Sequence, residues 1–269
     1  MLRANPHGMI DELSLSIPRH ALNPRHAVRA GEVWRLLQSA AVAASSRHGW
    51  PPERYRTSGT GFIVAHMVVV HHRELRDGET PTATTWVRDF RRGMLSRREI
   101  RLHCAGVPVV ATSQQWVHVS AAAMAPARAS AEMLAAFQPV TVDHEPVVMP
   151  AVTKGTGPSW RLEFRCWHSW MDVLSHVNHP TYVDWCDEAI LQRLATLGAD
   201  PTLLVPVAEE IRFRRGVLAG QDVVVESHLS GTADGDAVCT HTITADGVIA
   251  ATATTVRRLT EGSLAALLA

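Results

Sequence analysis

The chain of 269 residues repeats one order of predicted elements, and this duplication constrains its fold more than any other feature. In each half, a short strand precedes a helix with one apolar face, and four strands follow. The first half has a strand at 13–17, a helix from about Gly31, and strands at 61–72, 80–88, 94–104 and 107–119. The second half has a strand at 160–166, a helix at 180–197, and strands at 205–214, 222–230, 236–244 and 248–259. The element order repeats without a strong repeat of residues.

One long helix wrapped by an antiparallel sheet is the layout of the hotdog fold. Two copies in one chain predict an α+β double hotdog. Residues 121–159 are rich in alanine and proline and indicate a connector, with a short helix at 131–137. We therefore predict an N-terminal hotdog at 12–140, a linker at 141–158 and a C-terminal hotdog at 159–269.

Composition excludes several classes of function. Lys and Arg total 26, as do Asp and Glu, so the formal net charge is zero. This balance argues against binding to nucleic acid or to an anionic membrane, because phosphate recognition normally needs a basic excess. The four cysteines form no CxxC pair, and there is no HExxH motif, so we expect neither disulfides nor a metal site, and no cofactor. The chain shows no apolar run of about 20 residues and no signal-peptide pattern, so we expect a cytoplasmic protein.

The segment 167–189 carries the strongest motif and reads WHSWMDVLSHVNHPTYVDWCDEA. It resembles the D-x-x-x-H-V-N-N-x-x-Y-x-x-x-x-E-E-A signature of hotdog acyl thioesterases. The matching residues are Asp172, His176, Val177, Asn178, Tyr182, Glu188 and Ala189. Asp187 is a conservative change, and His179 replaces the second Asn.

The chain as a whole most resembles the tandem, double-hotdog acyl-ACP thioesterases. Segments outside the motif share that resemblance: 61–70, 85–87, 93–98 and 211–215. The resemblance implies hydrolysis of an acyl thioester, fatty or polyketide-like, carried by acyl carrier protein (ACP) or CoA. Two positions depart from the plant enzymes, because Leu174 stands where they keep an Asn, and Gly216-Val217 stands where they keep an acidic residue. The loop is in this respect closer to single-hotdog acyl-CoA thioesterases.

A thioester needs a nucleophile and a group that polarises its carbonyl. Asp172 is the candidate for direct attack or for activating water, and we favour general-base activation. We expect Asn178 to cap the helix with Pro180 at its first position, so that the helix N-terminus polarises the carbonyl. His176 is expected to hydrogen-bond Asp172 or the water, and Glu188 to assist from the tunnel side.

Each of these residues also has a purely structural interpretation. Asp172 can cap a turn, His176 can tie the loop to backbone carbonyls, and Glu188 can be a solvated helix residue. Tyr182 and His179 are candidate substrate-binding residues, and the alternative for Tyr182 is packing.

The first half lacks the motif, since residues 20–28 read HALNPRHAV. We therefore predict one active site per chain, at an internal seam, with the first hotdog shaping the acyl pocket. The assembly is expected to be a monomer or a homodimer of double hotdogs. Four arginines are weak candidates for binding an acidic carrier or CoA phosphates, the alternative being solvated strand faces: Arg97, Arg98, Arg214 and Arg215.

Two other functions remain open at this point. A double-hotdog dehydratase or hydratase would act on similar thioesters, but that class uses a D-x-N-P-x-H loop, and residues 172–176 lack its Asn and Pro. A non-catalytic hotdog that binds acyl chains or carriers is the third possibility.

Overall fold

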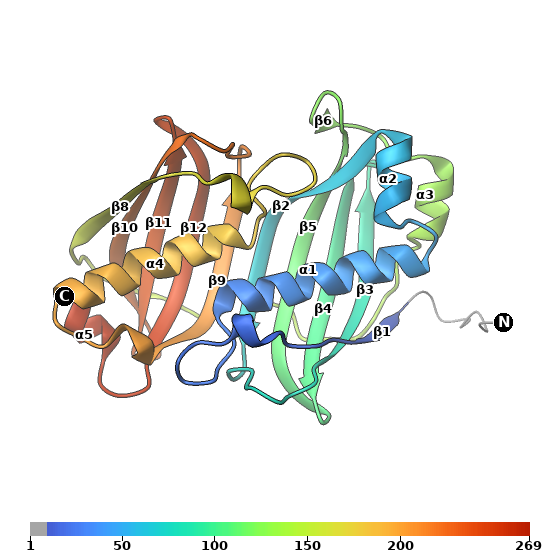
Figure 1. Cartoon of the computed structure of the whole chain (residues 1–269). Helices are drawn as coiled ribbons and strands as arrows, with labels where there is room; N and C mark the ends of the chain where they lie inside the picture. Colours follow the sequence, from blue (N-terminus) through green and yellow to red (C-terminus); the bar gives the residue numbers. More distant parts are fainter. Residues whose placement is uncertain (1–9) are drawn as a thin grey trace.

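The two halves form one continuous antiparallel sheet in the computed structural model, which describes residues 10–269 (Figure 1). Its strands follow the order β1-β3-β4-β5-β2-β9-β12-β11-β10-β7, with β6 on β5 and β8 on β10. The halves meet where β2 (Thr60–His71) pairs with β9 (Leu204–Phe213), with His66 to Val70 opposite Arg212 to Ala208. The predicted α+β double hotdog is confirmed.

The helices and remaining strands lie within a few residues of their predicted positions. The first half contains β1 (Asp11–Ser14), α1 (Ala30–Arg47), α2 (Pro52–Ser58), β3 (Thr82–Arg91), β4 (Leu95–Cys104), β5 (Val107–Ser120), β6 (Ala125–Pro126) and α3 (Ala131–Ala136). The second half contains β7 (Thr153–Lys154), β8 (Ser159–Arg165), α4 (Thr181–Thr196), β10 (Asp222–Ala233), β11 (Asp236–Ala245), β12 (Val248–Leu259) and α5 (Leu264–Leu268). The short helices α2 and α5 and the two-residue strands β6 and β7 were not predicted.

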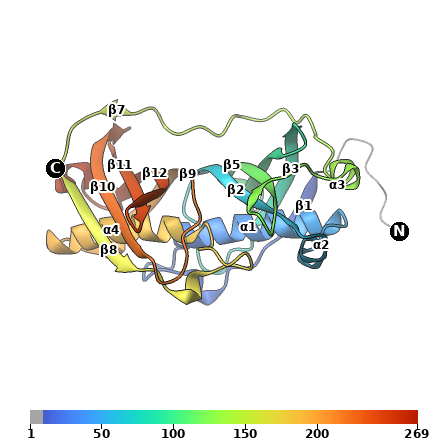
Figure 2. The same ribbon diagram turned by 90° about the horizontal axis from the view of Figure 1, so that it is seen from above.

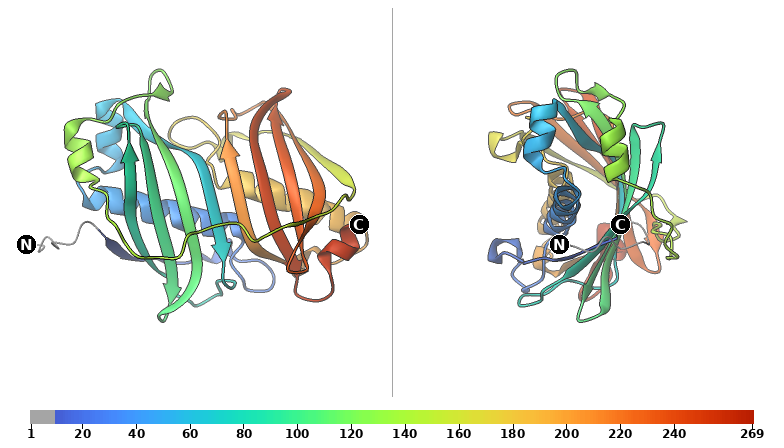
Figure 3. Two further views of the ribbon diagram at one scale, coloured as in Figure 1. Left: turned by 180° about the vertical axis from the view of Figure 1, so that it is seen from behind. Right: turned by 90° about the vertical axis from the view of Figure 1, so that its right-hand side faces the viewer.

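Helices α1 and α4 lie on the same face of the sheet, which curves around them (Figures 1 and 3). Their predicted apolar faces are buried, including Val33 and Leu37 on α1 and Cys186 and Ile190 on α4. The periodic spacing of these residues points one stripe of each helix at the sheet. The helices contact each other where Arg35 of α1 forms an ion pair of 2.6 Å with Asp184 of α4.

The connector crosses the opposite face of the sheet (Figures 2 and 3). The N–H of Val140 donates to the carbonyl of Val87 at 2.8 Å, and His144 packs edge-on against Trp86. The segment therefore covers the outer face of the first half while the helices cover the inner face. The limits of the predicted domains at 12–140, 141–158 and 159–269 stay predictions. Within residues 10–269, no helix combines the length and the apolar character that crossing a membrane requires.

Candidate active site

The motif loop before α4 holds Asp172 in a hydrogen-bonded turn. The N–H of Asp172 donates to the carbonyl of His176 at 2.7 Å, and the N–H of Ser175 donates to the carbonyl of Asp172 at 3.0 Å. Asp172 Oδ1 accepts the N–H of Leu174 at 2.8 Å. Ser175 has a left-handed backbone with φ of 60°. Within residues 10–269, Asp172 Oδ2 accepts no hydrogen bond, so half of the carboxylate remains available.

Asp172 borders a cavity of about 910 Å³, within the volume range typical of ligand pockets. The loop contributes Met171, Asp172, Val173, Leu174 and Asn178 to its wall. The first hotdog supplies the rest of the wall, from α1, α2 and the strands β2 to β5, including Gln38, Tyr55, Phe62, Val87, Arg98 and Trp116. The motif loop of the second half therefore borders a cavity lined mostly by the first half.

Asn178 pairs with Gln38, a residue that the sequence analysis missed. Gln38 Nε2 donates to Asn178 Oδ1 at 2.9 Å, and Asn178 Nδ2 donates to Gln38 Oε1 at 3.1 Å. The two amides join α1 to the motif loop, and both residues line the cavity. Each amide nitrogen has two hydrogens, so each keeps one after this pairing.

The predicted side-chain cap of α4 is wrong. Asn178 does not cap the helix, because its side chain is bonded to Gln38. The helix begins at Thr181, one residue after Pro180. The first helical N–H groups donate to nearby carbonyls: Thr181 to Asn178, Tyr182 to His179 and Val183 to Pro180. These bonds use the donors that we expected to polarise the substrate carbonyl.

His176 orders the loop instead of contacting the carboxylate of Asp172 through its ring. Its Nδ1 lies 2.9 Å from the carbonyl oxygen of Leu174. The ring fills the space beside Gly216, where a Cβ would lie 2.1 Å from His176 Cδ2. Any side chain at position 216, where the resemblance to the plant enzymes implies an acidic residue, would thus force this histidine ring to move.

His179 and Tyr182 do not line the cavity. The ring of His179 lies among Trp34, Trp116 and Phe213, and burial lowers its pKa to about 3, which keeps it neutral. The Tyr182 hydroxyl accepts the N–H of Val217 at 3.3 Å, and burial raises its pKa. Both residues support the loop from behind, in contrast to the predicted substrate contact.

Glu188 points away from the predicted tunnel. It is exposed and accepts a hydrogen bond from Gln192 one turn later. Its neighbour Asp187 faces inward and binds Arg257 Nε at 2.8 Å. Arg257 also binds Glu209 at 2.6 Å, and Glu209 accepts hydrogen bonds from His71 and Trp34. This buried chain of charges links α4 to the sheet, and none of Asp187, Glu209 and Arg257 lines the cavity.

The four candidate carrier-binding arginines lie in different environments. Arg214 and Arg215 are exposed, on the segment that leads to Gly216 and the motif loop. Arg97 is half-buried and paired with Asp89. Arg98 occupies an inward-facing position of β4, so it is only 8% exposed and lines the cavity. Its side chain is therefore not available to a carrier protein at the surface.

The first half folds a second copy of the motif loop, although its sequence lacks the motif. The N–H of Asn23 donates to Ala27 at 2.8 Å, and that of His26 donates to Asn23 at 2.9 Å. Asn23 Oδ1 accepts the N–H of Arg25 at 2.9 Å. His26 has φ of 57°. Asn23 thus stands in the place of Asp172, and Arg25 in the place of Leu174.

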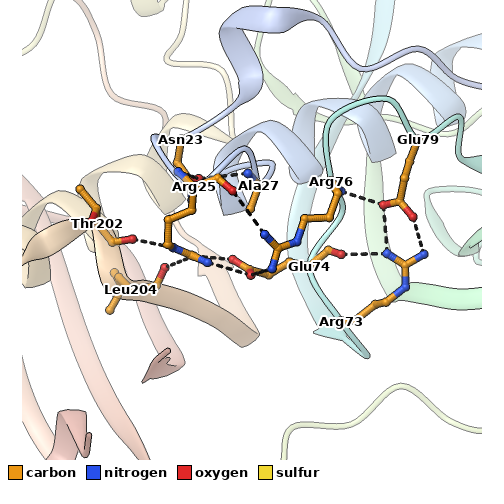
Figure 4. Close-up of polar contacts among 9 residues, drawn as sticks. All are labelled: Asn23, Arg25, Ala27, Arg73, Glu74, Arg76, Glu79, Thr202 and Leu204. Carbon is orange, nitrogen blue, oxygen red and sulfur yellow. Dashed lines mark hydrogen bonds and ion pairs between the residues drawn. The ribbon is translucent and has the colours of Figure 1, made fainter. Parts of the chain in front are cut away.

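Arg25 closes this second loop against the other hotdog (Figure 4). Its Nε donates to the carbonyl of Thr202 at 2.6 Å, and its Nη2 donates to the carbonyl of Leu204 at 3.0 Å. A two-point ion pair with Glu74 completes the arrangement, at 3.0 and 2.5 Å. With no carboxylate at position 23 and Arg25 bonded to the other hotdog, the second loop is consistent with the prediction of one active site.

Comparison with known proteins agrees with the fold. The model of the thioesterase-like superfamily matches residues 166–261, which contain the motif loop, α4 and β9 to β12. The resemblance to hotdog acyl thioesterases is confirmed. No curated protein sequence matches the chain.

Several solved thioesterase structures share the double hotdog over nearly the whole chain. A protein assigned as an oleoyl thioesterase from Lactobacillus plantarum has a TM-score of 0.78 at 17% identity, covering 96% of this chain and 99% of its own. The 12:0-ACP thioesterase of Umbellularia californica has a TM-score of 0.70 at 17% identity, covering 94% and 95%. An acyl-ACP thioesterase of Bacteroides thetaiotaomicron has a TM-score of 0.70 at 11% identity, covering 93% and 98%. At these identities the likeness establishes the fold.

Proposed function

We propose that this thioesterase-like hotdog protein hydrolyses an acyl thioester of ACP or CoA. One observation carries the proposal: the half-free carboxylate of Asp172 and the Gln38–Asn178 amide pair border the same large cavity. A base and carbonyl-binding donors beside an acyl-sized space are what thioester hydrolysis requires.

The amide pair is the candidate site for the thioester carbonyl. Gln38 and Asn178 each keep one N–H, and their oxygens are both engaged within the pair. These two donors replace the helix N–H groups that were predicted to serve, because the latter are bonded within the first turn. Donors that are fixed in advance stabilise the oxyanion of the tetrahedral intermediate.

Asp172 then acts as the general base. Its free oxygen takes a proton from water, and the resulting hydroxide adds to the carbonyl carbon. The tetrahedral intermediate collapses with cleavage of the C–S bond, and the proton returns to the departing thiolate. The products are a carboxylic acid and the carrier thiol. His176 positions Asp172 through the backbone of the loop.

The acyl chain occupies the cavity of the first hotdog, and the carrier remains outside. Arg214 and Arg215 are the remaining candidates for its charged groups, since they lie next to Gly216, which touches His176. An acidic carrier protein and the phosphates of CoA both suit these exposed guanidinium groups.

The test is a turnover panel of acyl-CoAs and acyl-ACPs of graded length, read as thiol release. The matched variants are Asp172→Asn and Asp172→Ala. Because Asn keeps an oxygen for the N–H of Leu174, it preserves the loop and removes only the base. We expect both variants to lose at least about a hundredfold in kcat. Unchanged turnover in Asp172→Asn would overturn the mechanism. Water elimination from 3-hydroxyacyl thioesters, or binding without thiol release by the wild type, would overturn the thioesterase function.

A further inference from the structure

The cavity wall contains a buried arginine on a strand face whose next two inward-facing residues are apolar. Arg98 alternates along β4 with outward-facing residues, and its inward neighbours Ile100 and Leu102 belong to the core. Arg98 itself is 8% exposed and lines the cavity. Charged side chains are rarely buried unless a partner of opposite charge accompanies them.

Arg98 has no such partner among residues 10–269. Its Nη1 donates to Thr85 Oγ1 at 3.1 Å, which is its one side-chain hydrogen bond there, and no carboxylate lies within 4.0 Å of it. The carboxylate of Asp11 favours the charged form of Arg98 from beyond 4.0 Å, but this carboxylate is already bound to His48 at 2.7 Å. Burial lowers the pKa of Arg98, yet a guanidinium remains protonated in proteins.

The neighbouring polar groups are also donors without acceptors. The hydroxyl of Ser96, two residues before Arg98 and also on the cavity wall, makes no hydrogen bond within residues 10–269. Gln114 stands directly opposite Arg98 on β5, and its buried Nε2 has no partner. The buried Nε1 of Trp50, another wall residue, also lacks one. These three donors of the first hotdog therefore have no acceptor among residues 10–269.

The cavity runs from the motif loop to these donors. Leu174 of the loop packs against Gly61 on β2, and Ser96 and Arg98 lie on β4, with β5 between the two strands. Two strand spacings correspond to about 10 Å across the sheet. A group bound at Arg98 would thus belong to the end of the acyl chain distant from a thioester at Asp172.

We propose that Arg98, with Ser96, receives a carboxylate at the distal end of the acyl group, so that the preferred substrates are monothioesters of dicarboxylic acids. A carboxylate supplies both the missing acceptors and the missing opposite charge, which a methyl end would not. The substrate class rests on the proposed function, whereas the binding preference can be measured without turnover.

The alternative is a structural role in which one water links Arg98 to Asp11. A small void of about 10 Å³ lies between Asp11, His48 and Arg98, so it holds at most a single water. Under that alternative, removing the guanidinium destabilises the fold and leaves chain selectivity unchanged. Under the proposal, removing a buried charge without a carboxylate partner leaves the melting temperature of the free protein equal or higher.

The experiment compares suberyl-CoA with octanoyl-CoA, and sebacyl-CoA with decanoyl-CoA, as kcat/KM ratios. Wild type is expected to prefer the dicarboxylic member of at least one pair. Arg98→Met should lose that preference by about tenfold or more, the value of a charge-assisted hydrogen bond. Arg88→Met, on the exposed side of β3, is the control and should retain the preference. A wild-type preference for the plain acyl chain in both pairs, or an unchanged ratio in Arg98→Met, would overturn the proposal.

Binding to Asp172→Asn separates this inference from the proposed function. Calorimetry should show tighter binding of suberyl-CoA than of octanoyl-CoA to Asp172→Asn, and loss of the difference in Asp172→Asn/Arg98→Met. If Asp172→Asn still turns over, the mechanism fails while the preference at Arg98 stands. If Asp172→Asn is inactive but binds both thioesters equally, the inference at Arg98 fails while the mechanism stands.

Discussion

The side-chain amides of Gln38 and Asn178 hold each other by two hydrogen bonds, 2.9 and 3.1 Å long. They lie 140 residues apart in the chain, on the long helix of the first hotdog and on the motif loop of the second. The pair lines the cavity beside Asp172, so the candidate active site is assembled from both halves.

Replacing Gln38 should reduce activity more than stability. Gln38→Leu removes one of the two proposed carbonyl donors and leaves Asn178 without its partner. We expect kcat to fall by about ten- to a hundredfold, with a loss in unfolding free energy of about 1–2 kcal/mol. Gln192→Leu, on the exposed side of α4, is the matched control. Steady-state kinetics and urea denaturation check both values; wild-type kcat in Gln38→Leu would remove Gln38 from the mechanism.

Gly216→Ala should displace the motif loop. The new Cβ would stand 2.1 Å from His176 Cδ2, so the ring and the turn that carries Asp172 must move. Misplacing a catalytic group by about 1 Å can cost a hundredfold in rate. We expect kcat to fall by at least tenfold while the melting temperature changes little. Retained wild-type kinetics would show that the position of His176 does not affect the site.

The buried pair of Glu209 and Arg257 should make stability dependent on pH. Its neighbours hold the pKa of Glu209 at about 2, below its usual value of 4.5, against the opposing effect of burial. The unfolded chain therefore takes up this proton first as the pH falls. The stabilisation is complete above about pH 4.5 and is lost progressively toward about pH 2.

Glu209→Gln tests this dependence. At neutral pH we expect a loss of about 3 kcal/mol, because the variant leaves Arg257 with Asp187 as its one carboxylate partner among residues 10–269. The difference from wild type should shrink as the pH is lowered toward about 3. Urea denaturation across this range provides the measurement. A difference that stays constant with pH would exclude the proposed linkage.

The copied loop of the first half should remain inactive even with a carboxylate. Asn23→Asp restores the acid at the position equivalent to Asp172, but Arg25 still binds the carbonyls of Thr202 and Leu204 and ties the loop to the other hotdog. We therefore expect the double variant Asn23→Asp/Asp172→Asn to release no thiol. Recovery of thiol release in the double variant would mean that the first loop has access to substrate.

The sequence predicted the architecture well because periodicity and turn residues are local signals. The strand at 248–259 and the helix at 180–197 were placed within one residue of β12 and α4. The motif loop was found from its resemblance to the thioesterase signature, whose residues, including Asp172 and Asn178, lie close together in sequence.

Partners distant in sequence could not be predicted in this way. Gln38 lies on a helix whose periodicity predicts which face is buried. The periodicity does not predict which residue of the other half a side chain beside that face will contact. Glu188 and Asp187 are adjacent acids, and only the rotation of α4 against the sheet decides that Asp187 turns inward to Arg257. The copied loop around Asn23 was missed because its hydrogen bonds come mostly from the backbone, which tolerates different side chains.

The central claim is that Asp172 is the base of a thioesterase, and thiol release by wild type and Asp172→Asn tests it most directly. The two proteins should share the same melting temperature, because Asn retains the hydrogen bond to Leu174. We predict robust turnover of at least one acyl-CoA or acyl-ACP by wild type and a loss of at least about a hundredfold in Asp172→Asn. Equal turnover by the two proteins would contradict the claim.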